Sequence, residues 1–304
     1  MTTLVFGANG QVGQELLRAL AASGPLLATT RSGRLPDGSA CETADFDQPQ
    51  TLSALLDRVQ PTAVVNAAAY TAVDRAEQDR DAALRANAEA PAAIAGWCAA
   101  HGVPLVHYST DYVFDGQGTR PYPEDAPTAP LGVYGATKLA GEEAIRASGA
   151  QHLIFRTAWV YAAHGSNFLR TMLRVAERDE LRVVADQVGT PTPAALIADV
   201  TAQVLRQRDA AQSGTWHLTA AGETTWHGFA EVIFEDALAA GLLARAPRVL
   251  PIGTAEYPTP AKRPAYSRLD VSRLQRDFSL VLPQWRDGLR QVIGELAAQA
   301  PQSA

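Results

Sequence analysis

Tyr134 and Lys138 combine two side chains that can move a proton, because they stand four residues apart and so share one face of a helix. A nearby ammonium group favours the phenolate, which brings the pKa of a tyrosine from about 10 closer to neutral pH. Hydride arriving at a ketone carbon leaves negative charge on the oxygen, which then needs a proton donor. We therefore predict Tyr134 as the acid and Lys138 as the group that lowers its pKa.

Thr110 is the third candidate catalytic residue. It lies in Ser109-Thr110-Asp111, at the end of the apolar run 104–108. The carboxyl end of a strand is where a doubly wound sheet binds its ligands. The hydroxyl of Thr110 could bond the same ketone oxygen as Tyr134, or it could cap the turn that follows. Both interpretations remain open from the sequence.

The chain opens on a pattern typical of dinucleotide binding, in which a short apolar run leads through a glycine turn into a helical segment. Gly7, Gly10 and Gly13 have GxxGxxG spacing. We expect Gly7 to make the tight turn, Gly10 to let the backbone approach a pyrophosphate, and Gly13 to let the helix lie close to the sheet. The alternative is a glycine turn in an ordinary strand-to-helix connection.

The elements that position these residues alternate along the chain, which predicts a parallel sheet covered by helices on both faces. Strands are predicted near residues 3–6, 25–30, 63–66 and 104–109, and helices near 11–22, 50–59, 85–100 and 135–148. The predicted fold class is α/β, a Rossmann-like doubly wound parallel sheet with a smaller C-terminal α/β lobe. We expect the dinucleotide-binding domain to span residues 1–160 and about 186–210, and the substrate-binding lobe to comprise 161–185 and about 211–304.

Composition excludes several other classes of protein. The 304 residues, 47% of them hydrophobic, can bury a substantial core. The formal net charge of −6 disfavours binding to nucleic acid or to an anionic membrane. The first strand begins too close to Met1 for a signal peptide, and no apolar stretch approaches the ~20 residues of a membrane span. We expect a cytoplasmic protein.

Disulfides and metal sites have little support in the sequence. Cys41 and Cys98 are too few for a disulfide framework and show no metal spacing. The six histidines include no HxxxH or HxH pair. We predict no metal site.

Longer motifs resemble the extended short-chain dehydrogenase/reductase superfamily and, within it, the dTDP-4-dehydrorhamnose reductases. The matching strings are GANGQVG (7–13), NAAAYTAVDRAE (66–77), STDYVFDG (109–116), YGATKLAGE (134–142), RTAWVY (156–161), DQVGTPT (186–192) and RPAYSRLD (263–270). The resemblance implies reduction of dTDP-4-dehydro-L-rhamnose at C4 to dTDP-L-rhamnose. The residues by themselves imply only a ketone on a nucleotide-bound sugar.

The cofactor is expected to be NADPH, with NADH also accepted. The residue that ends the second strand decides between the two, and here the stretch Ala28-Thr29-Thr30-Arg31-Ser32 offers no carboxylate for the ribose hydroxyls. Arg31 and Ser32 could hold a 2′-phosphate instead. The other expected cofactor contacts are Gly7, Asn9, Gly10, Gln11, Val12, Gly13, Asp45, Phe46, Ala67, Ala68, Ala69, Tyr70, Tyr134 and Lys138. Among these, the resemblance assigns Asp45 and Phe46 to the adenine and Lys138 to the nicotinamide ribose.

Substrate contacts are expected from Thr110, Asp111, Tyr134, Trp159 and Arg263. The resemblance places an aromatic residue such as Trp159 against the sugar, although a tryptophan there could instead fill the core between the lobes. Arg263 is the expected partner of the diphosphate, with an exposed loop residue as the alternative. The partner is thus a nucleotide sugar.

Neighbouring activities differ at the residue after Asp111. The sugar-nucleotide dehydratases of the superfamily carry Thr-Asp-Glu, whereas this chain has Thr110-Asp111-Tyr112 and lacks the second acid for loss of water. An epimerase with a trapped cofactor and a non-catalytic, NADP-binding regulatory subunit remain as alternatives. The intact Thr110, Tyr134 and Lys138 count against the regulatory subunit, because a protein that only binds needs no proton donor.

Some members of the family form dimers bridged by a divalent metal, which a Glu in the first helix and an acidic residue after the DQ-G-PT loop hold. Glu15 matches the first ligand, but residues 193–196 read Pro-Ala-Ala-Leu and the next carboxylate is Asp199. A hard cation needs several oxygen ligands. We therefore predict no bridging metal, and a monomer or a homodimer.

Overall fold

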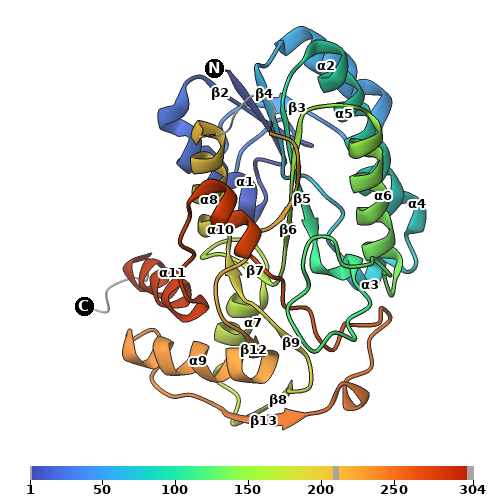
Figure 1. The fold of residues 1–304 in the computed structure, drawn as a ribbon. Helices are drawn as coiled ribbons and strands as arrows, with labels where there is room; N and C mark the ends of the chain where they lie inside the picture. The colour runs from blue at the N-terminus through green and yellow to red at the C-terminus, as the bar shows by residue number, and fades with distance from the viewer. Residues whose placement is uncertain (1, 208–211, 300–304) are drawn as a thin grey trace.

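A seven-stranded parallel sheet forms the larger of two lobes (Figure 1). The computed structural model describes residues 2–207 and 212–299. The strand order is β11-β6-β5-β4-β1-β2-β3, and every neighbouring pair is parallel. The strands are β1 Thr3–Phe6, β2 Leu26–Thr30, β3 Glu42–Thr43, β4 Ala63–Asn66, β5 Leu105–Thr110, β6 His152–Thr157 and β11 Gly214–His217.

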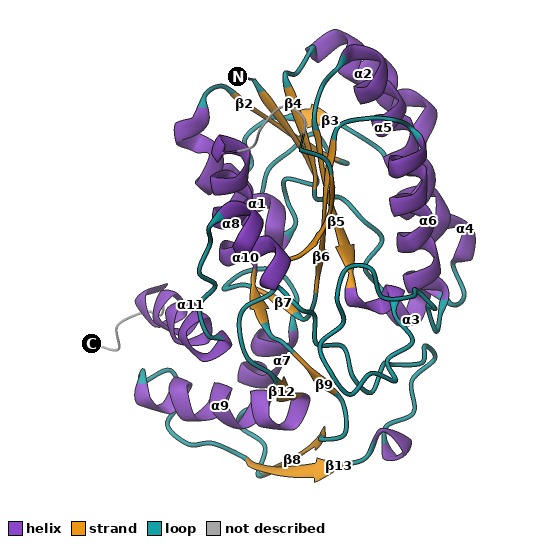
Figure 2. Cartoon of the chain, in the orientation of Figure 1, coloured by secondary structure: helices purple, strands orange, loops and turns teal. Residues whose placement is uncertain are grey.

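Helices cover both faces of this sheet (Figure 2). On one face lie α1 (Gln11–Leu20), α8 (Ala194–Gln207) and α10 (Ser272–Phe278), and on the other α2 (Leu52–Val59), α5 (Ala90–His101) and α6 (Val133–Ala147). Short helices α3 (Val73–Ala76) and α4 (Arg80–Leu84) follow β4. Successive strand residues point to opposite faces, so Val5 packs in the first helical layer and Leu4 in the second. The predicted Rossmann-like α/β fold is confirmed.

The smaller lobe has its own core of aromatic and aliphatic side chains. Tyr161, Phe229 and Leu289 are fully buried in it. Its elements are β7 Val160–Tyr161, α7 Phe168–Arg174, β8 Glu180–Val184, β9 Val188–Gly189, β10 Thr192–Pro193, β12 Thr224–Thr225, α9 Trp226–Ala239, β13 Arg248–Ile252 and α11 Trp285–Gln299. Strands β7 and β10 pair in parallel, as do β8 and β13, whereas β9 and β12 are antiparallel. The two lobes interleave in sequence, as the mixed colours of Figure 1 show.

The division between the lobes differs from the predicted one at two elements. The sequence prediction placed residues 211–304 in the smaller lobe, but β11 is an edge strand of the large sheet and α10 packs on that sheet. Trp216 on β11 lies edge-on to Phe278 on α10, with 5.3 Å between ring centroids. A four-residue strand paired with the distant β6 leaves no local pattern in the sequence, which explains the difference.

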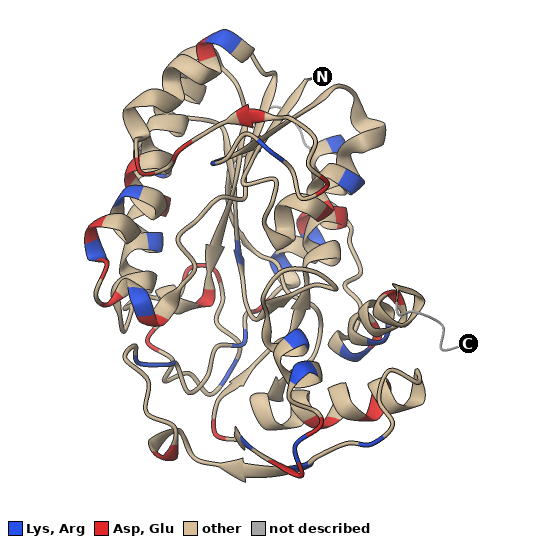
Figure 3. Ribbon diagram, turned by 180° about the vertical axis from the view of Figure 1, so that it is seen from behind, with Lys and Arg blue, Asp and Glu red and all other residues tan. Residues whose placement is uncertain are grey.

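Charged residues lie mainly on the outer helices and loops, where Lys and Arg alternate with Asp and Glu (Figure 3). In the part of the chain that the structure describes, none of the helices has the length and apolar character needed to span a bilayer.

A buried ion pair joins β6 to α6. The guanidinium of Arg156 contacts both carboxylate oxygens of Glu142, at 2.9 and 2.7 Å, and the two side chains are 4% and 0% exposed. Arg146 adds a third contact from the next helical turn, at 3.0 Å. The pair fixes α6, which carries Tyr134, against the sheet.

We predict that Arg156→Met lowers the free energy of unfolding by about 3 kcal/mol, because it leaves the Glu142 carboxylate buried without its main partner. Adding Glu142→Gln should recover most of this loss, since no unpaired charge then remains. Urea unfolding measures both variants. Arg245→Met, which removes an exposed pair with Asp179, is the control and should cost less than about 1 kcal/mol. An equally small cost for Arg156→Met would contradict the prediction.

Candidate active site

A cavity of about 660 Å³ opens at the carboxyl ends of the central strands. Among the predicted cofactor contacts, its lining includes Gly7, Asn9, Gly10, Gln11, Val12, Arg31, Asp45, Phe46, Ala67, Ala68, Ala69 and Tyr70. Among the predicted catalytic and substrate contacts, it includes Thr110, Asp111, Tyr134, Lys138 and Trp159. Gly13, Ser32 and Arg263 lie outside the lining.

The first turn needs its glycines for close packing. Gly7 has φ of 75°, and a Cβ there would lie 2.6 Å from the backbone nitrogen of Ala68 at the end of β4. A Cβ on Gly13 would lie 2.1 Å from the carbonyl oxygen of Gly7, so this glycine fits α1 against the turn itself. Gly10 precedes α1 without a side-chain cap. No side chain therefore caps the first amides of α1, and because Gln11 and Val12 line the cavity, these amides could bond a pyrophosphate there.

Arg31 already has acidic partners at the rim of the cavity. Its guanidinium lies 3.2 Å from Asp45 and also contacts Asp47, while its side chain is 68% exposed. A phosphate at this position would share Arg31 with two carboxylates. Ser32 turns toward the carbonyl oxygen of Arg34, at 3.5 Å, rather than toward the cavity.

Tyr134 stands in the first turn of α6, half-buried beside an aromatic neighbour. The backbone N–H of Val133 donates to Glu77 at 2.8 Å, which anchors the start of the helix. The Tyr112 ring lies edge-on to the Tyr134 ring, with centroids 5.5 Å apart. Burial raises the pKa of Tyr134 above its usual value, and a hydrogen bond with Thr110 offsets part of this effect. The phenol is therefore protonated at neutral pH.

Lys138 differs from its predicted role in one respect. Its ammonium donates to the carbonyl oxygen of Tyr108 at 2.6 Å and lies 3.3 Å from Nε2 of His107. Burial lowers the pKa of Lys138 to about 8, against a raising effect of Glu142. The expected lowering of the Tyr134 pKa by Lys138 is wrong, because burial raises that pKa and Thr110, not Lys138, is the neighbour that lowers it.

The Thr110 hydroxyl makes the turn contacts that the sequence left as an alternative. It donates to Asp111 at 3.0 Å and accepts from the backbone N–H of Tyr112 at 3.2 Å. Thr110 also lines the cavity beside Tyr134. Its hydrogen bonds to the turn therefore orient the hydroxyl group and do not remove it from the site. Burial raises the pKa of Asp111 to about 6, with hydrogen bonds from Ser267 and Thr110 opposing the shift.

Trp159 belongs both to the cavity and to the smaller lobe. It has φ of 49°, and its indole stacks on Trp226 of α9 with 3.6 Å between centroids and 7° between planes. A Cβ on Gly189 would lie 2.5 Å from the Trp159 ring, so only glycine fits there. Trp159 can therefore both offer a surface to the sugar and fill the core between the lobes.

Arg263 connects the lobes. Its guanidinium pairs with Asp74 at 2.5 Å and donates to the hydroxyl of Tyr112 at 3.1 Å. Through Tyr112 the arginine reaches the neighbourhood of Tyr134, although it does not line the cavity.

Several lining residues were not singled out from the sequence. Asn66, Tyr108 and Tyr112 are the most informative, because each lies beside Lys138, Tyr134 or the end of a strand. Asn66 ends β4 as Thr110 ends β5. A polar residue closing an apolar strand was the signal that could have identified it.

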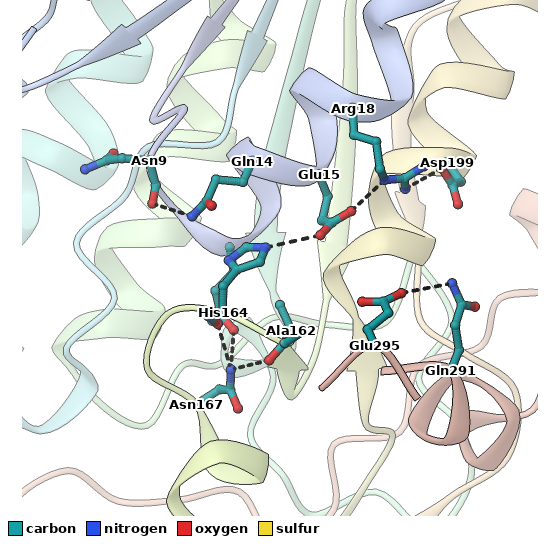
Figure 4. Close-up of polar contacts among 12 residues, drawn as sticks. Asn9, Gln14, Glu15, Arg18, Ala162, His164, Asn167, Asp199, Gln291 and Glu295 are labelled. Atoms are coloured by element: carbon teal, nitrogen blue, oxygen red, sulfur yellow. Dashed lines mark hydrogen bonds and ion pairs between the residues drawn. The ribbon is translucent and has the colours of Figure 1, made fainter. Parts of the chain in front are cut away.

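Glu15 takes part in an ion-pair chain between α1, α8 and the loop before α7 (Figure 4). Its carboxylate lies 3.1 Å from His164 and 2.8 Å from Arg18, whose guanidinium also contacts Asp199 at 2.8 Å. The hydrogen bond from His164 is the largest cause that lowers the pKa of Glu15. Within residues 2–207 and 212–299, no group of three or more His, Cys, Asp or Glu side chains gathers as metal ligands do.

The Rossmann-like sheet, with a glycine turn and a cavity at its carboxyl end, has the architecture of a dinucleotide-binding protein. The family model described as RmlD substrate binding domain matches residues 1–298. The dTDP-4-dehydrorhamnose reductase of Shigella flexneri is 46% identical over 299 residues, which cover 97% of this chain and 98% of that protein. The chain belongs to the dTDP-4-dehydrorhamnose reductase family, and the resemblance of its motifs is confirmed.

Solved structures give the same fold. A dTDP-4-dehydrorhamnose reductase ortholog from Clostridium acetobutylicum ATCC 824 superposes with a TM-score of 0.88 at 35% identity, covering 97% of this chain and 99% of that one. The enzyme of that name from Bacillus anthracis str. Ames, in complex with NADP, has a TM-score of 0.87 at 32% identity, with coverage of 97% and 99%.

We predict that Asp111→Asn stabilises the protein at pH 7.5. A carboxyl whose pKa is about 6 when folded and about 4 when unfolded holds its proton more tightly in the folded state. Ionisation of Asp111 therefore lowers the free energy of unfolding. This loss grows between pH 4 and pH 6 and is constant above pH 6. The variant should gain on the order of 2 kcal/mol at pH 7.5 and little at pH 4.

Urea unfolding of the Asp111→Asn variant at the two pH values measures this difference. Asp287→Asn, at a carboxylate that is 62% exposed on α11, is the control and should change little at either pH. A gain of the same size at both pH values would show that the effect is not one of ionisation.

Proposed function

We propose that this protein reduces the C4 ketone of dTDP-4-dehydro-L-rhamnose to dTDP-L-rhamnose with NADPH, and that Tyr134 donates the proton. Membership of the family supports the substrate. The observation that carries the mechanism is a half-buried, protonated phenol beside Thr110, in the same cavity as the glycine turn.

The first turn and the strand ends would hold the cofactor. The uncapped amides of α1 suit the pyrophosphate, and Ala67, Ala68 and Ala69 leave room beside the end of β4. When bound, NADPH supplies the hydride. Arg31 would then bond the 2′-phosphate, in competition with Asp45 and Asp47, which is why we expect NADH to be accepted as well.

Tyr134 and Thr110 would act on the ketone oxygen. As negative charge develops there, Tyr134 gives up its proton, and Thr110 donates after its hydroxyl turns away from Asp111. A phenol with a raised pKa is already protonated before each turnover, which suits reduction. Lys138, with one N–H on Tyr108, keeps another for the cofactor ribose.

The smaller lobe and its connections would hold the nucleotide sugar. Trp159 offers an aromatic surface at the cavity, held in place by Trp226. Arg263 would serve the diphosphate after exchanging its contact with Asp74, and Asp111 would bond a sugar hydroxyl. Without a second acid after Asp111, the end of β5 lacks the adjacent pair of carboxylates that loss of water needs.

Tyr134→Phe should lower kcat at least about 100-fold, because the proton donor is lost, while the Kd for NADPH changes less than about twofold. NADPH oxidation is followed by absorbance, with dTDP-4-dehydro-L-rhamnose generated in situ. Tyr161→Phe, which removes a buried hydroxyl in the core of the smaller lobe, is the matched control and should keep its rate.

A Tyr134→Phe variant that retains the full rate would remove Tyr134 from the mechanism. If the unmodified protein binds NADPH tightly but oxidises none, a regulatory binder or an epimerase with a trapped cofactor replaces the reductase.

Arg31→Ala should weaken NADPH about tenfold and NADH less than about threefold, because only NADPH carries the 2′-phosphate that a guanidinium can bond. Fluorescence titration of both cofactors measures the ratio. Arg34→Ala, in the same loop but bonded to the carbonyl oxygen of Gly38, is the control. An equal loss of affinity for both cofactors would mean that Arg31 does not bind the 2′-phosphate.

A further inference from the structure

Three polar side chains form a buried chain at the wall of the cavity, which two of them, Asn66 and Lys138, line. Asn66 ends β4, His107 lies on β5 and Lys138 on α6, and they are 1%, 0% and 2% exposed. Nδ2 of Asn66 lies 3.1 Å from Nδ1 of His107, and Nε2 of His107 lies 3.3 Å from Nζ of Lys138. Since none of the three reaches water easily, the direction of each hydrogen bond matters.

Asn66 determines which nitrogen of His107 carries the proton. The backbone N–H of Ala68 donates to Oδ1 of Asn66 at 3.0 Å, so the amide oxygen must point that way. The amide NH2 then faces Nδ1 of His107 and can only donate. Burial lowers the pKa of His107 well below its usual value, so the ring is neutral. Its single proton must therefore lie on Nε2, facing Lys138.

An Nε2–H group suits a neutral lysine better than a charged one. The lone pair of a neutral amine accepts from His107, one N–H donates to the carbonyl oxygen of Tyr108 at 2.6 Å, and the second N–H remains for the cavity. An ammonium group has no lone pair, so an N–H of Lys138 would meet the N–H of His107.

The other charged and titratable groups around Lys138 come from its own helix and from β5 and β6. Glu142, one turn along α6, favours the ammonium form. That carboxylate is itself paired with Arg156 on β6 and with Arg146. Tyr134 is protonated and carries no charge. The imidazole N–H is thus a contact that works against the ammonium, in addition to burial.

We propose that His107, held as the Nε2–H tautomer by Asn66, is a positioning residue that stabilises the neutral form of Lys138 during turnover. The proposal rests on the proposed reductase function. When the ketone oxygen takes the proton of Tyr134, the phenolate must regain one, and the ammonium of Lys138 supplies it. Neutral Lys138 then takes a proton from solvent before the next cycle. His107 lowers the cost of the intermediate state and is not consumed.

Asn66→Asp should reverse the tautomer. A carboxylate accepts from the N–H of Ala68 and from an Nδ1–H of His107, so Nε2 becomes an acceptor for the ammonium of Lys138. The alkaline limb of the kcat profile should then move up by about one pH unit. His107→Gln, whose amide oxygen can also face Lys138, should shift the limb in the same direction. His101→Gln, at a histidine that is 39% exposed on α5, is the control and should leave the limb in place.

The protonation state of Lys138 can be measured by NMR without turnover, because the chain has only two lysines, Lys138 and the exposed Lys262. In protein labelled with 13C-lysine, the Cε resonance of Lys138 should titrate near the alkaline limb and move up in both variants, while that of Lys262 stays unchanged. In protein labelled with 15N-histidine, His107 should show a proton on Nε2 and none on Nδ1 at pH 7.

A proton on Nδ1 of His107 in the unmodified protein overturns the proposal. So do variants that lower the rate equally at all pH values with an unshifted Lys138 resonance, which is what a purely structural role would give. If the resonances behave as expected but the protein does not oxidise NADPH, the reductase function fails while the tautomer and its effect on Lys138 stand.

Discussion

The close approach of the first turn to the end of β4 decides where everything else in the cavity lies. Gly7 and Ala68 are in backbone contact, and Gly13 brings α1 onto that same turn. A side chain at either glycine would push α1 away from the strand ends. Because α1 packs on α8, the displacement would pass to the helical layer and to the smaller lobe, whose strand β10 leads into α8.

Burial sets the charge state of the catalytic side of the cavity. It favours the uncharged forms of Tyr134, Lys138, His107 and Asp111, which raises the pKa of the acids and lowers that of the bases. The pair of Glu142 and Arg156 keeps full charges at comparable depth, because each partner neutralises the other. In such a site Tyr134 is protonated before the reaction begins, and Lys138 loses its proton more readily than an exposed lysine does.

The sequence predicted the sheet and most of the cavity because strand ends and glycine spacing are local signals. Thr110, Tyr134 and Gly7 each occur in such a signal, and the described structure places them in one cavity. The strand β11 was misplaced because its pairing with β6 depends on residues far away in the chain. Likewise, the raised pKa of Tyr134, which burial rather than Lys138 determines, is a property of the packed site. No spacing of residues encodes it.

The stacked indoles of Trp159 and Trp226 have an optical consequence. Two such chromophores held 3.6 Å apart and nearly parallel couple their electronic transitions, so the pair absorbs and emits as one unit rather than as two separate tryptophans. One ring borders the cavity and the other belongs to α9. The protein thus carries a built-in spectroscopic reporter at the border between its lobes, whose ellipticity is sensitive to any rotation of one ring over the other.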